Sequence, residues 1–356
     1  MPLKKRSQKP FKINTFFLVP IFFKTVMCGI CGKINFNDQT VEDSQIRRMC
    51  RSFAYRGPDD EGLYVTNVNG DEINRSFHVG LGHQRLSIID LSGVGRQPMS
   101  NEDGTIWITY NGEIYNYREI TNKLKEKGHI FKSETDTEVI LHLYEEKGID
   151  AINYLNGMFA FALWDENRKR LWACRDRIGI KPFVYFWDGE HFIFASEIKA
   201  LLMDSIISKE LDYEALQLYL AFNYVPAPFT IFKGIKKLEP GQYLLLQNKN
   251  IEIKTYWETP LSIDQDFAAH PLQEQVEVFR KPLYEGLNDA VRSRMIADVP
   301  LGAFLSGVID SSIVVALMAI NSRQPVKTFS IGFKDDSLYD ETLYAREVAQ
   351  RYHTDH

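Results

Sequence analysis

Cys28 carries the clearest sign of chemistry in this sequence, because it directly follows a methionine, Met27. If Met27 and the residues before it are removed, Cys28 has both a thiol and a free α-amine. An α-amine has a pKa of about 7.7–8.0, so part of it is neutral near pH 7 and can accept the thiol proton. While the preceding residues stay attached, that nitrogen is an amide and the base is lost. The pattern predicts a cysteine nucleophile that processing of the chain activates.

Two other interpretations of Cys28 stay open at this point. It could be a buried structural residue, or it could form a C-x-x-C metal or redox pair with Cys31. A structural zinc site needs four ligands, and Cys50 and Cys174 stand singly and far along the sequence. We therefore predict no metal ligand set. Four cysteines in 356 residues cannot build a disulfide framework either, which indicates a reducing compartment such as the cytoplasm.

Asn111 and Gly112 follow a segment, 105–110, in which polar and apolar residues alternate as in a half-buried strand. Asn111 offers a side-chain amide donor and Gly112 an exposed backbone N–H. These are the two kinds of donor that can hold a tetrahedral oxyanion. The competing interpretation is an Asn-Gly turn that ends the strand, which is common.

Two charged residues could recognise an amino acid. Arg85 has a guanidinium fork that is suited to a carboxylate, and Asp136 could hold an α-ammonium group. Each is equally compatible with a solvated surface side chain.

A third candidate site lies between a predicted strand, 299–305, and a predicted helix, 311–320. The turn at 306–312 contains small and hydroxyl-bearing residues that present backbone N–H groups and a helix N-terminus to an anion. It does not match the P-loop pattern, which excludes that class of nucleotide-binding protein. An ordinary strand-to-helix turn with Asp and Ser near the N-cap remains an alternative.

The elements that position these residues form two domains. The first domain, residues 28–240, is rich in short strands, and further strands are expected at 158–164, 170–174 and 191–196. A helix is expected from Thr135 to Gly148, with Thr135 and Glu138 forming a capping box at its start. A connector is expected at 241–267. From 268 to 356, helices at 272–296, 311–320 and 340–352 alternate with strands at 299–305 and 326–333, which indicates the start of a parallel sheet. The chain stops after only two of its strands, so we expect this domain to be truncated.

Residues 1–27 differ from the rest of the chain, since basic residues precede a short apolar stretch at 16–23. No cleavage site follows that stretch, so we expect a mis-set start or a propeptide rather than an export signal. No apolar run approaches the roughly 20 residues that cross a membrane. A net charge of -5 without a Lys/Arg cluster beyond the first dozen residues argues against a nucleic-acid partner.

With these residues assembled, the chain resembles the glutamine-hydrolysing asparagine synthetase family. The resemblance rests on an ordered set of motifs rather than on any single one. They are Met-Cys-Gly-Ile at 27–30, Arg-Gly-Pro-Asp at 56–59, His-Gln-Arg-Leu-Ser at 83–87, Tyr-Asn-Gly-Glu-Ile-Tyr-Asn at 110–116, Asp-Thr-Glu-Val at 136–139, Asn-Gly-Met-Phe-Ala-Phe-Ala at 156–162, Arg-Asp-Arg-Ile-Gly-Ile-Lys-Pro at 175–182, Ala-Ser-Glu-Ile-Lys-Ala at 195–200, Asp-Val-Pro-Leu-Gly at 298–302 and Thr-Phe-Ser-Ile-Gly-Phe at 328–333.

For the first domain the resemblance implies an α+β N-terminal-nucleophile fold, with two antiparallel sheets between helices. Cys28 would attack the side-chain amide of glutamine, and Asn111 and Gly112 would hold the oxyanion. Arg85 would grip the glutamine α-carboxylate. The residues expected to place its ammonium group are Asp136, Glu113 and the backbone carbonyls near Leu86 and Ile88.

For the second domain it implies an α/β fold of the ATP-pyrophosphatase type, which takes Mg-ATP and aspartate as substrates. Aspartate would be adenylated, and ammonia delivered through an internal channel would displace AMP. Relatives in the family are often homodimers. The residues expected to bind ATP are Ser306, Gly307, Asp310, Ser311 and Ser312 at the pyrophosphate, with Leu305 and Ile331 at the nucleotide.

Two departures from the family pattern limit these expectations. Val308 stands where the family has a second glycine, and a β-branched residue resists positive φ and blocks close approach of a phosphate. The family's later pyrophosphate and aspartate segments do not occur before His356. We therefore expect glutaminase chemistry without asparagine synthesis from this polypeptide. The alternatives are an amidotransferase with another ammonia acceptor and a non-catalytic glutamine sensor whose amine stays blocked.

Overall fold

The computed structural model describes residues 27–37, 39–66, 78–261, 268–332 and 340–356. Its larger part contains two six-stranded sheets, in which neighbouring strands of the described ranges pair antiparallel. In sheet A the order is β10 (Ile235–Lys237), β8 (Val184–Trp187), β9 (His191–Ala195), β1 (Gly29–Asn35), β3 (His78–Arg85) and β2 (Asp60–Val65). In sheet B it is β12 (Asn250–Thr255), β11 (Gln242–Gln247), β7 (Arg170–Arg175), β6 (Gly157–Asp165), β5 (Ile106–Ile114) and β4 (Met99–Ser100).

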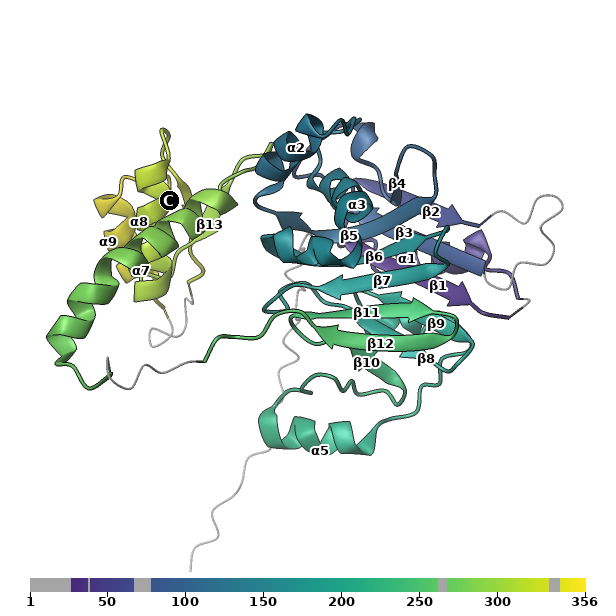
Figure 1. Ribbon diagram of the computed structural model, residues 1–356. Coiled ribbons are helices and arrows are strands. Elements are labelled where there is room, and N and C mark those ends of the chain that lie inside the picture. Colours follow the sequence, from purple (N-terminus) through teal and green to yellow (C-terminus); the bar gives the residue numbers. More distant parts are fainter. Residues whose placement is uncertain (1–26, 38, 67–77, 262–267, 333–339) are drawn as a thin grey trace, which may run out of the picture.

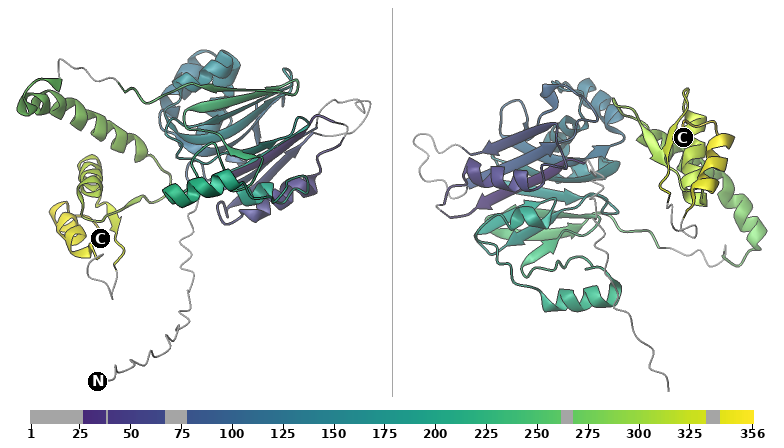
Figure 2. Two further views of the ribbon diagram at one scale, coloured as in Figure 1. Left: turned by 90° about the horizontal axis from the view of Figure 1, so that it is seen from below. Right: turned by 180° about the vertical axis from the view of Figure 1, so that it is seen from behind.

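Helices cover the outer face of each sheet, so the layers run helix, sheet, sheet, helix (Figures 1 and 2). One apolar cluster fills the space between the sheets, and two others lie between a sheet and its helices. The covering helices are α1 (Asp43–Ser52) and α4 (Ile198–Leu201) on sheet A, and α2 (Tyr117–Glu126) and α3 (Asp136–Lys147) on sheet B, while α5 (Tyr213–Phe222) follows later in the chain. The predicted arrangement of two antiparallel sheets between helices is confirmed.

Strand β5 shows why alternation alone misjudged burial. Its strand character was predicted correctly, and Ile106, Ile108 and Tyr110 pack into the cluster beneath α2 and α3. The intervening residues, however, do not face water. The hydroxyl of Thr109 donates to the Gly82 carbonyl of sheet A at 3.0 Å. The prediction of a half-buried strand was wrong, because the second sheet covers the polar face.

Helix α3 begins and ends close to the predicted residues, but its capping differs. The Thr135 hydroxyl accepts a bond from the Glu138 N–H at 3.4 Å, and Gly148 ends the helix at φ 58°. The Glu138 carboxylate does not complete a capping box. It accepts instead from the backbone N–H groups of Lys132 and Ser133, at 2.8 and 2.7 Å. The helix is thereby anchored to the loop that precedes it.

The predicted connector is shorter than 241–267, because β11 and β12 belong to sheet B and continue the first domain to residue 255. Residues 262–267 lie outside the described ranges. A smaller α/β part follows, and Figures 1 and 2 show it beside the two-sheet part. Its elements are α7 (Leu272–Arg294), β13 (Gly302–Phe304), α8 (Ile309–Asn321), β14 (Lys327–Phe329) and α9 (Thr342–Arg351).

Strands β13 and β14 pair in parallel, as the alternation of strands and helices predicted. Both are shorter than expected, and the end of the second predicted strand, Phe333, lies outside the described residues, as does the chain before Met27. Among the helices of the described ranges, none combines the length and the apolar character that crossing a membrane requires.

Candidate active site

One cavity, of about 60 Å³, brings together all eight residues predicted to bind or attack an amino-acid amide. They come from the residue before β1, the end of β3 with the loop after it, the end of β5 and the start of α3. These segments lie far apart in sequence, and only the pairing of the sheets and the seating of α3 make them neighbours. The eight are Cys28, Arg85, Leu86, Ile88, Asn111, Gly112, Glu113 and Asp136.

The Cys28 thiol lies at the wall of this cavity. Its Sγ accepts a bond from the Leu86 N–H at 3.3 Å and lies 3.5 Å from the Leu86 carbonyl oxygen. Burial raises the pKa of the thiol, while the Leu86 N–H and the positive charges of Lys181 and Arg85 act in the opposite direction. The thiol is therefore the resting form, and attack on a carbonyl requires a base.

Asn111 lies in the middle of the sheet pairing and is nearly fully buried. Its side-chain Nδ2 has no hydrogen-bond partner among the described residues. An unsatisfied buried donor costs about 1–3 kcal/mol, so such a group in a cavity indicates a bound partner that accepts a hydrogen bond. The alternative of a strand-ending turn is wrong, because β5 runs on to Ile114 with Asn111 opposite Ala160.

Gly112 is required by the close approach of β5 and β6. A Cβ at this position would lie 2.3 Å from the carbonyl oxygen of Met158 and 2.7 Å from the Cα of Phe159. Any side chain would therefore push the two strands apart beside the cavity.

Asp136 is the first residue of α3, and its carboxylate accepts bonds from several donors, including the backbone N–H groups of Asp136 and Thr137. The Tyr110 hydroxyl lies 2.6 Å from Oδ2 and the Ile114 N–H lies 2.8 Å from it. Burial raises the pKa of Asp136, and these two bonds oppose the rise. A cationic ligand would supply the charge that favours the ionised carboxylate.

Arg85 lines the cavity but also holds the loop that closes it. Its guanidinium donates to the carbonyl oxygens of Asp90 and of Ser92, the latter at 2.8 Å. Gly95 leaves room for this group, since a Cβ there would lie 2.5 Å from Nη2. The loop is thus shaped around the arginine, which faces the cavity from a fixed position.

Lys181 is a site residue to which the sequence analysis assigned no role. Its Nζ donates to the Met27 sulfur at 3.2 Å. Burial lowers the pKa of this ammonium group, while the negative charges of Glu113 and Cys28 raise it. Its backbone N–H is held by Asp176 Oδ2 at 2.9 Å. Lys181 belongs to the motif at 175–182, but no local pattern shows that its side chain lines the cavity.

The C-x-x-C interpretation is not supported. Cys31 faces away from the cavity into the cluster between sheet A and α1, and its Sγ lies 3.5 Å from that of Cys50. The thiols of Cys28 and Cys31 therefore lie in different environments, the first at the cavity and the second in the apolar cluster.

In the smaller part, a second cavity of about 330 Å³ is lined by four of the seven residues predicted to bind ATP, Leu305, Ser306, Ser311 and Ile331. The other three, Gly307, Asp310 and Ser312, do not line it. The hydroxyls of Ser306 and Ser311 bond to each other at 2.9 Å, and that of Ser312 donates to the Val308 carbonyl at 2.7 Å.

The backbone argument against Val308 is corrected by the geometry of this turn. Gly307 takes the positive φ, 84°, whereas Val308 has an extended backbone with φ -78°. A valine adopts that conformation without strain. Its exposed side chain, rather than its backbone, is what distinguishes Val308 from a glycine at this position.

The two parts of the chain meet at the rim of the first cavity. The Asp298 N–H donates to the carbonyl oxygen of Ile88 at 3.0 Å, and its Oδ2 accepts from the Asp90 N–H at 2.9 Å. The guanidinium of Arg294 lies over the ring of Tyr115, 4.4 Å from its centroid. The segment after α7 thus contacts the loop that borders the cavity around Cys28.

Comparison with known families agrees with this geometry. The family model described as "Glutamine amidotransferase domain" matches residues 27–257. The chain belongs to that family. A second family model, described as "Asparagine synthase", matches residues 283–356 of the same chain.

Curated relatives cover most of the chain. A protein of Methanocaldococcus jannaschii, named for glutamine-hydrolyzing asparagine synthesis, is 41% identical over 93% of the chain and 64% of its own length. "Asparagine synthetase 1" of Bacillus subtilis, also named glutamine-hydrolyzing, is 39% identical over 91% of the chain and 48% of its own length. "Amidase chry2" of Gibberella zeae is 36% identical over 83% of the chain and 44% of its own length. The chain thus spans about half to two thirds of the length of these relatives.

Proposed function

We propose that this chain hydrolyses the side-chain amide of glutamine at Cys28 and supplies the ammonia for a glutamine-dependent asparagine synthetase. The observation that carries the proposal is the buried, unsatisfied Nδ2 of Asn111 in the same cavity as the Cys28 thiol. A donor of this kind beside a nucleophile suits the oxyanion of an acyl transfer reaction.

The reaction begins when Sγ of Cys28 attacks the amide carbon and its proton passes to the α-amine that removal of Met27 exposes. Asn111 Nδ2 and the Gly112 N–H hold the negative oxygen that forms. Protonation of the leaving nitrogen releases ammonia and leaves a thioester. Water then attacks the thioester, glutamate departs, and the thiol is restored. The Lys181 ammonium supplies positive charge next to the sulfur, which favours the thiolate.

Glutamine is held by its α-carboxylate and α-ammonium groups. We assign the carboxylate to Arg85, and the ammonium to Asp136, Glu113 and the carbonyls of Leu86 and Ile88. Burial raises the pKa of Glu113 as it does that of Asp136. A bound cation would lower both values, so the pair favours a positively charged ligand over an uncharged one.

For the smaller part we propose Mg-ATP and aspartate as substrates. Ser306, Gly307, Asp310, Ser311 and Ser312 would face the pyrophosphate, and Leu305 and Ile331 the nucleotide. The match at 283–356 and the relatives' names support this assignment. The aspartate β-carboxylate would be adenylated, and ammonia would displace AMP. We place the enzyme in the cytoplasm and expect a homodimer.

A different ammonia acceptor is the second candidate. It is favoured by the 36% identity to a protein that is named an amidase rather than a synthetase. The two candidates share the cavity around Cys28 and differ only in what the ammonia reaches.

The test measures glutamate release by protein whose first residue is Cys28, confirmed by mass spectrometry of the N-terminus. We expect turnover that Cys28→Ala abolishes and that Asn111→Ala lowers on the order of 100- to 1,000-fold. Cys31→Ala is the matched thiol control and should retain turnover. Turnover that survives Cys28→Ala would refute the proposal. Full activity with Met27 still attached would refute the role of the α-amine. Aspartate- and ATP-dependent AMP release by this chain would contradict the expectation of glutaminase chemistry without asparagine synthesis.

A further inference from the structure

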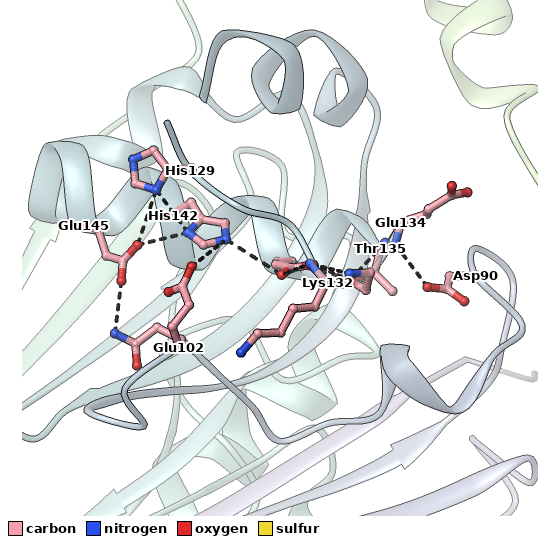
Figure 3. Close-up of polar contacts among 11 residues, drawn as sticks. Asp90, Glu102, His129, Lys132, Glu134, Thr135, His142 and Glu145 are labelled. Atoms are coloured by element: carbon pink, nitrogen blue, oxygen red, sulfur yellow. Dashed lines mark hydrogen bonds and ion pairs between the residues drawn. The ribbon is translucent and has the colours of Figure 1, made fainter. Parts of the chain in front are cut away.

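A second group of potential ligand atoms lies on the outer side of sheet B, outside the cavity described above. His142 and Glu145 lie on α3, and His129 lies in the loop after α2 (Figure 3). The two Nδ1 atoms are 3.2 Å apart. Glu145 Oε2 lies 3.0 Å from Nδ1 of His142 and 3.6 Å from Nδ1 of His129. Two imidazole nitrogens and one carboxylate oxygen thus form a compact triangle.

The size of this triangle matches one face of a tetrahedral metal site. Zinc binds histidine nitrogen and carboxylate oxygen at about 2.0–2.2 Å, which places tetrahedral ligands about 3.4 Å from one another. The three observed separations, 3.0, 3.2 and 3.6 Å, lie on either side of that value. An ion could therefore bind all three atoms without a rearrangement of the backbone.

Two of the three groups are also hydrogen-bonded from behind, as metal ligands commonly are, and the third faces carboxylates. Nε2 of His129 lies 3.2 Å from the carboxylate of Glu146. Nε2 of His142 makes no hydrogen bond among the described residues, but it faces the carboxylates of Glu138 and Glu102 at 3.7 and 3.9 Å. With their Nε2 atoms protonated towards these carboxylates, both rings direct the Nδ1 lone pair at the triangle.

Glu145 is oriented in the same way. Its Oε1 accepts a bond from Asn101 Nδ2 at 3.0 Å, which leaves Oε2 facing the two rings. The ring of Phe131 packs edge-on against that of His142, with centroids 4.6 Å apart, and limits its rotation. Three side chains from two separate segments are thereby held towards a common point.

We propose that His129, His142 and Glu145 form a binding site for a divalent transition-metal ion of the Zn²⁺ type, with water as the fourth ligand. The His142 side chain is almost fully buried, but those of His129 and Glu145 are 16% and 24% exposed. Solvent can therefore reach the open position. Imidazole and carboxylate together suit zinc better than magnesium or calcium, which prefer oxygen ligands.

The alternative occupant is a proton. Two nitrogen lone pairs cannot face each other at 3.2 Å, so without a metal one Nδ1 donates to its neighbours and the cluster is a hydrogen-bonded ion network. Metal binding would release that proton. It would also fasten the loop that contains His129 to α3, whose first residue is Asp136 of the amide-binding cavity.

The experiment titrates Co²⁺, a visible-light probe for zinc sites, into the full chain carrying Cys28→Ala, so that the cavity thiol cannot bind the metal. We expect one equivalent to give the intense visible absorption of tetrahedral cobalt, with no thiolate charge-transfer band, and Zn²⁺ to displace it. Zn²⁺ should also raise the melting temperature.

Three variants in the same background test the ligands. His129→Ala and Glu145→Gln should weaken Co²⁺ binding on the order of 100-fold, and Glu146→Gln about 10-fold, because Glu146 only orients a ligand. The matched control is His191→Ala. His191 also pairs with a carboxylate, that of Asp188 at 2.9 Å, but it lies outside the cluster, so its replacement should leave Co²⁺ binding unchanged.

Absence of the tetrahedral spectrum in the parent protein would overturn the proposal and leave the hydrogen-bonded network as the explanation. So would equal binding by the parent, His129→Ala and Glu145→Gln proteins. Circular dichroism of each variant checks that a loss of binding does not arise from a loss of folding.

Discussion

Replacing Tyr110 with phenylalanine would remove the one side-chain donor given for the Asp136 carboxylate. The Tyr110 hydroxyl lies 2.6 Å from Asp136 Oδ2, and both side chains are buried. The ring of phenylalanine fills the same space, so the change removes a hydrogen bond with little effect on packing. The Ile114 N–H and the backbone N–H groups of Asp136 and Thr137 then remain as donors to the carboxylate.

The size of the effect follows from the charge on the acceptor. A hydrogen bond to a charged group contributes about 1.5–3 kcal/mol, and 1.36 kcal/mol corresponds to one pH unit, so the pKa of Asp136 should rise by about 1–2 pH units. Burial already raises that pKa, and the lost bond had opposed the rise. Asp136 attracts the ammonium group of glutamine only when it is ionised, that is, above its pKa. Glutamine binding should therefore weaken as the pH falls. In the Tyr110→Phe protein this loss of affinity should begin at a higher pH than in its parent.

The assay is calorimetric titration of glutamine between pH 5 and 8 into protein that begins at residue 28 and carries Cys28→Ala, which prevents turnover. We expect the dissociation constant of the Tyr110→Phe protein to exceed that of its parent by about 10- to 100-fold at the acid end. The difference should shrink as the pH rises and both carboxylates ionise.

Tyr144→Phe provides the matched control. The Tyr144 hydroxyl donates to Asp165 Oδ2 at 2.8 Å, so it is also a buried tyrosine bound to a carboxylate, but it does not line the cavity. Its removal should lower stability without moving the pH profile of glutamine binding. If the two variants shift that profile equally, or if Tyr110→Phe leaves it unmoved, the assignment of Asp136 to the ammonium group is wrong.

Three further predictions test the fold and its junctions. Gly112→Ala should lower the free energy of unfolding by about 1–3 kcal/mol, because the new Cβ would lie 2.3 Å from the Met158 carbonyl oxygen. The control is Gly286→Ala, where a Cβ has no atom within 4 Å and should not destabilise the protein. Equal midpoints of urea unfolding for the two variants would contradict this prediction. Burial lowers the pKa of His83 to about 3, so the folded state keeps it neutral while the unfolded chain gains a proton below pH 6.5. The contribution of His83 to the free energy of unfolding should therefore fall by roughly 5 kcal/mol between pH 6.5 and 3. His83→Gln should show a smaller slope of the unfolding free energy against pH, and an unchanged slope would contradict the role of His83. Asp298→Ala should raise the dissociation constant for glutamine about 2- to 10-fold, since it frees a loop at the cavity rim, and an unchanged constant would show that the loop holds its shape without this contact.

Some of this site could be predicted from short stretches of sequence. A cysteine after a methionine, an Asn-Gly pair at the end of an alternating segment and an aspartate after a helix-capping threonine each have a local physical meaning. The order of the motifs then indicated one family. The structure places these residues around one cavity, while the role of Cys28 and its own α-nitrogen stays a prediction.

Other features depend on segments that meet only in three dimensions. Alternation along β5 predicted one solvent-exposed face of the strand, but the second sheet buries that face. Lys181 reaches the cavity because Asp176 holds its backbone, and no local periodicity contains that information. Helix α3 is anchored by Glu138 to the preceding loop rather than by a capping box.

The sequence by itself determined which atoms can perform the chemistry, since a thiol, an amide and a carboxylate are properties of single residues. The tertiary structure alone decided which of them meet. His129 and His142 stand on different segments and carry no ligand motif, yet their nitrogens lie 3.2 Å apart because helix packing on sheet B places them there. Reactivity is local, whereas proximity depends on long-range packing that no short stretch of the chain encodes.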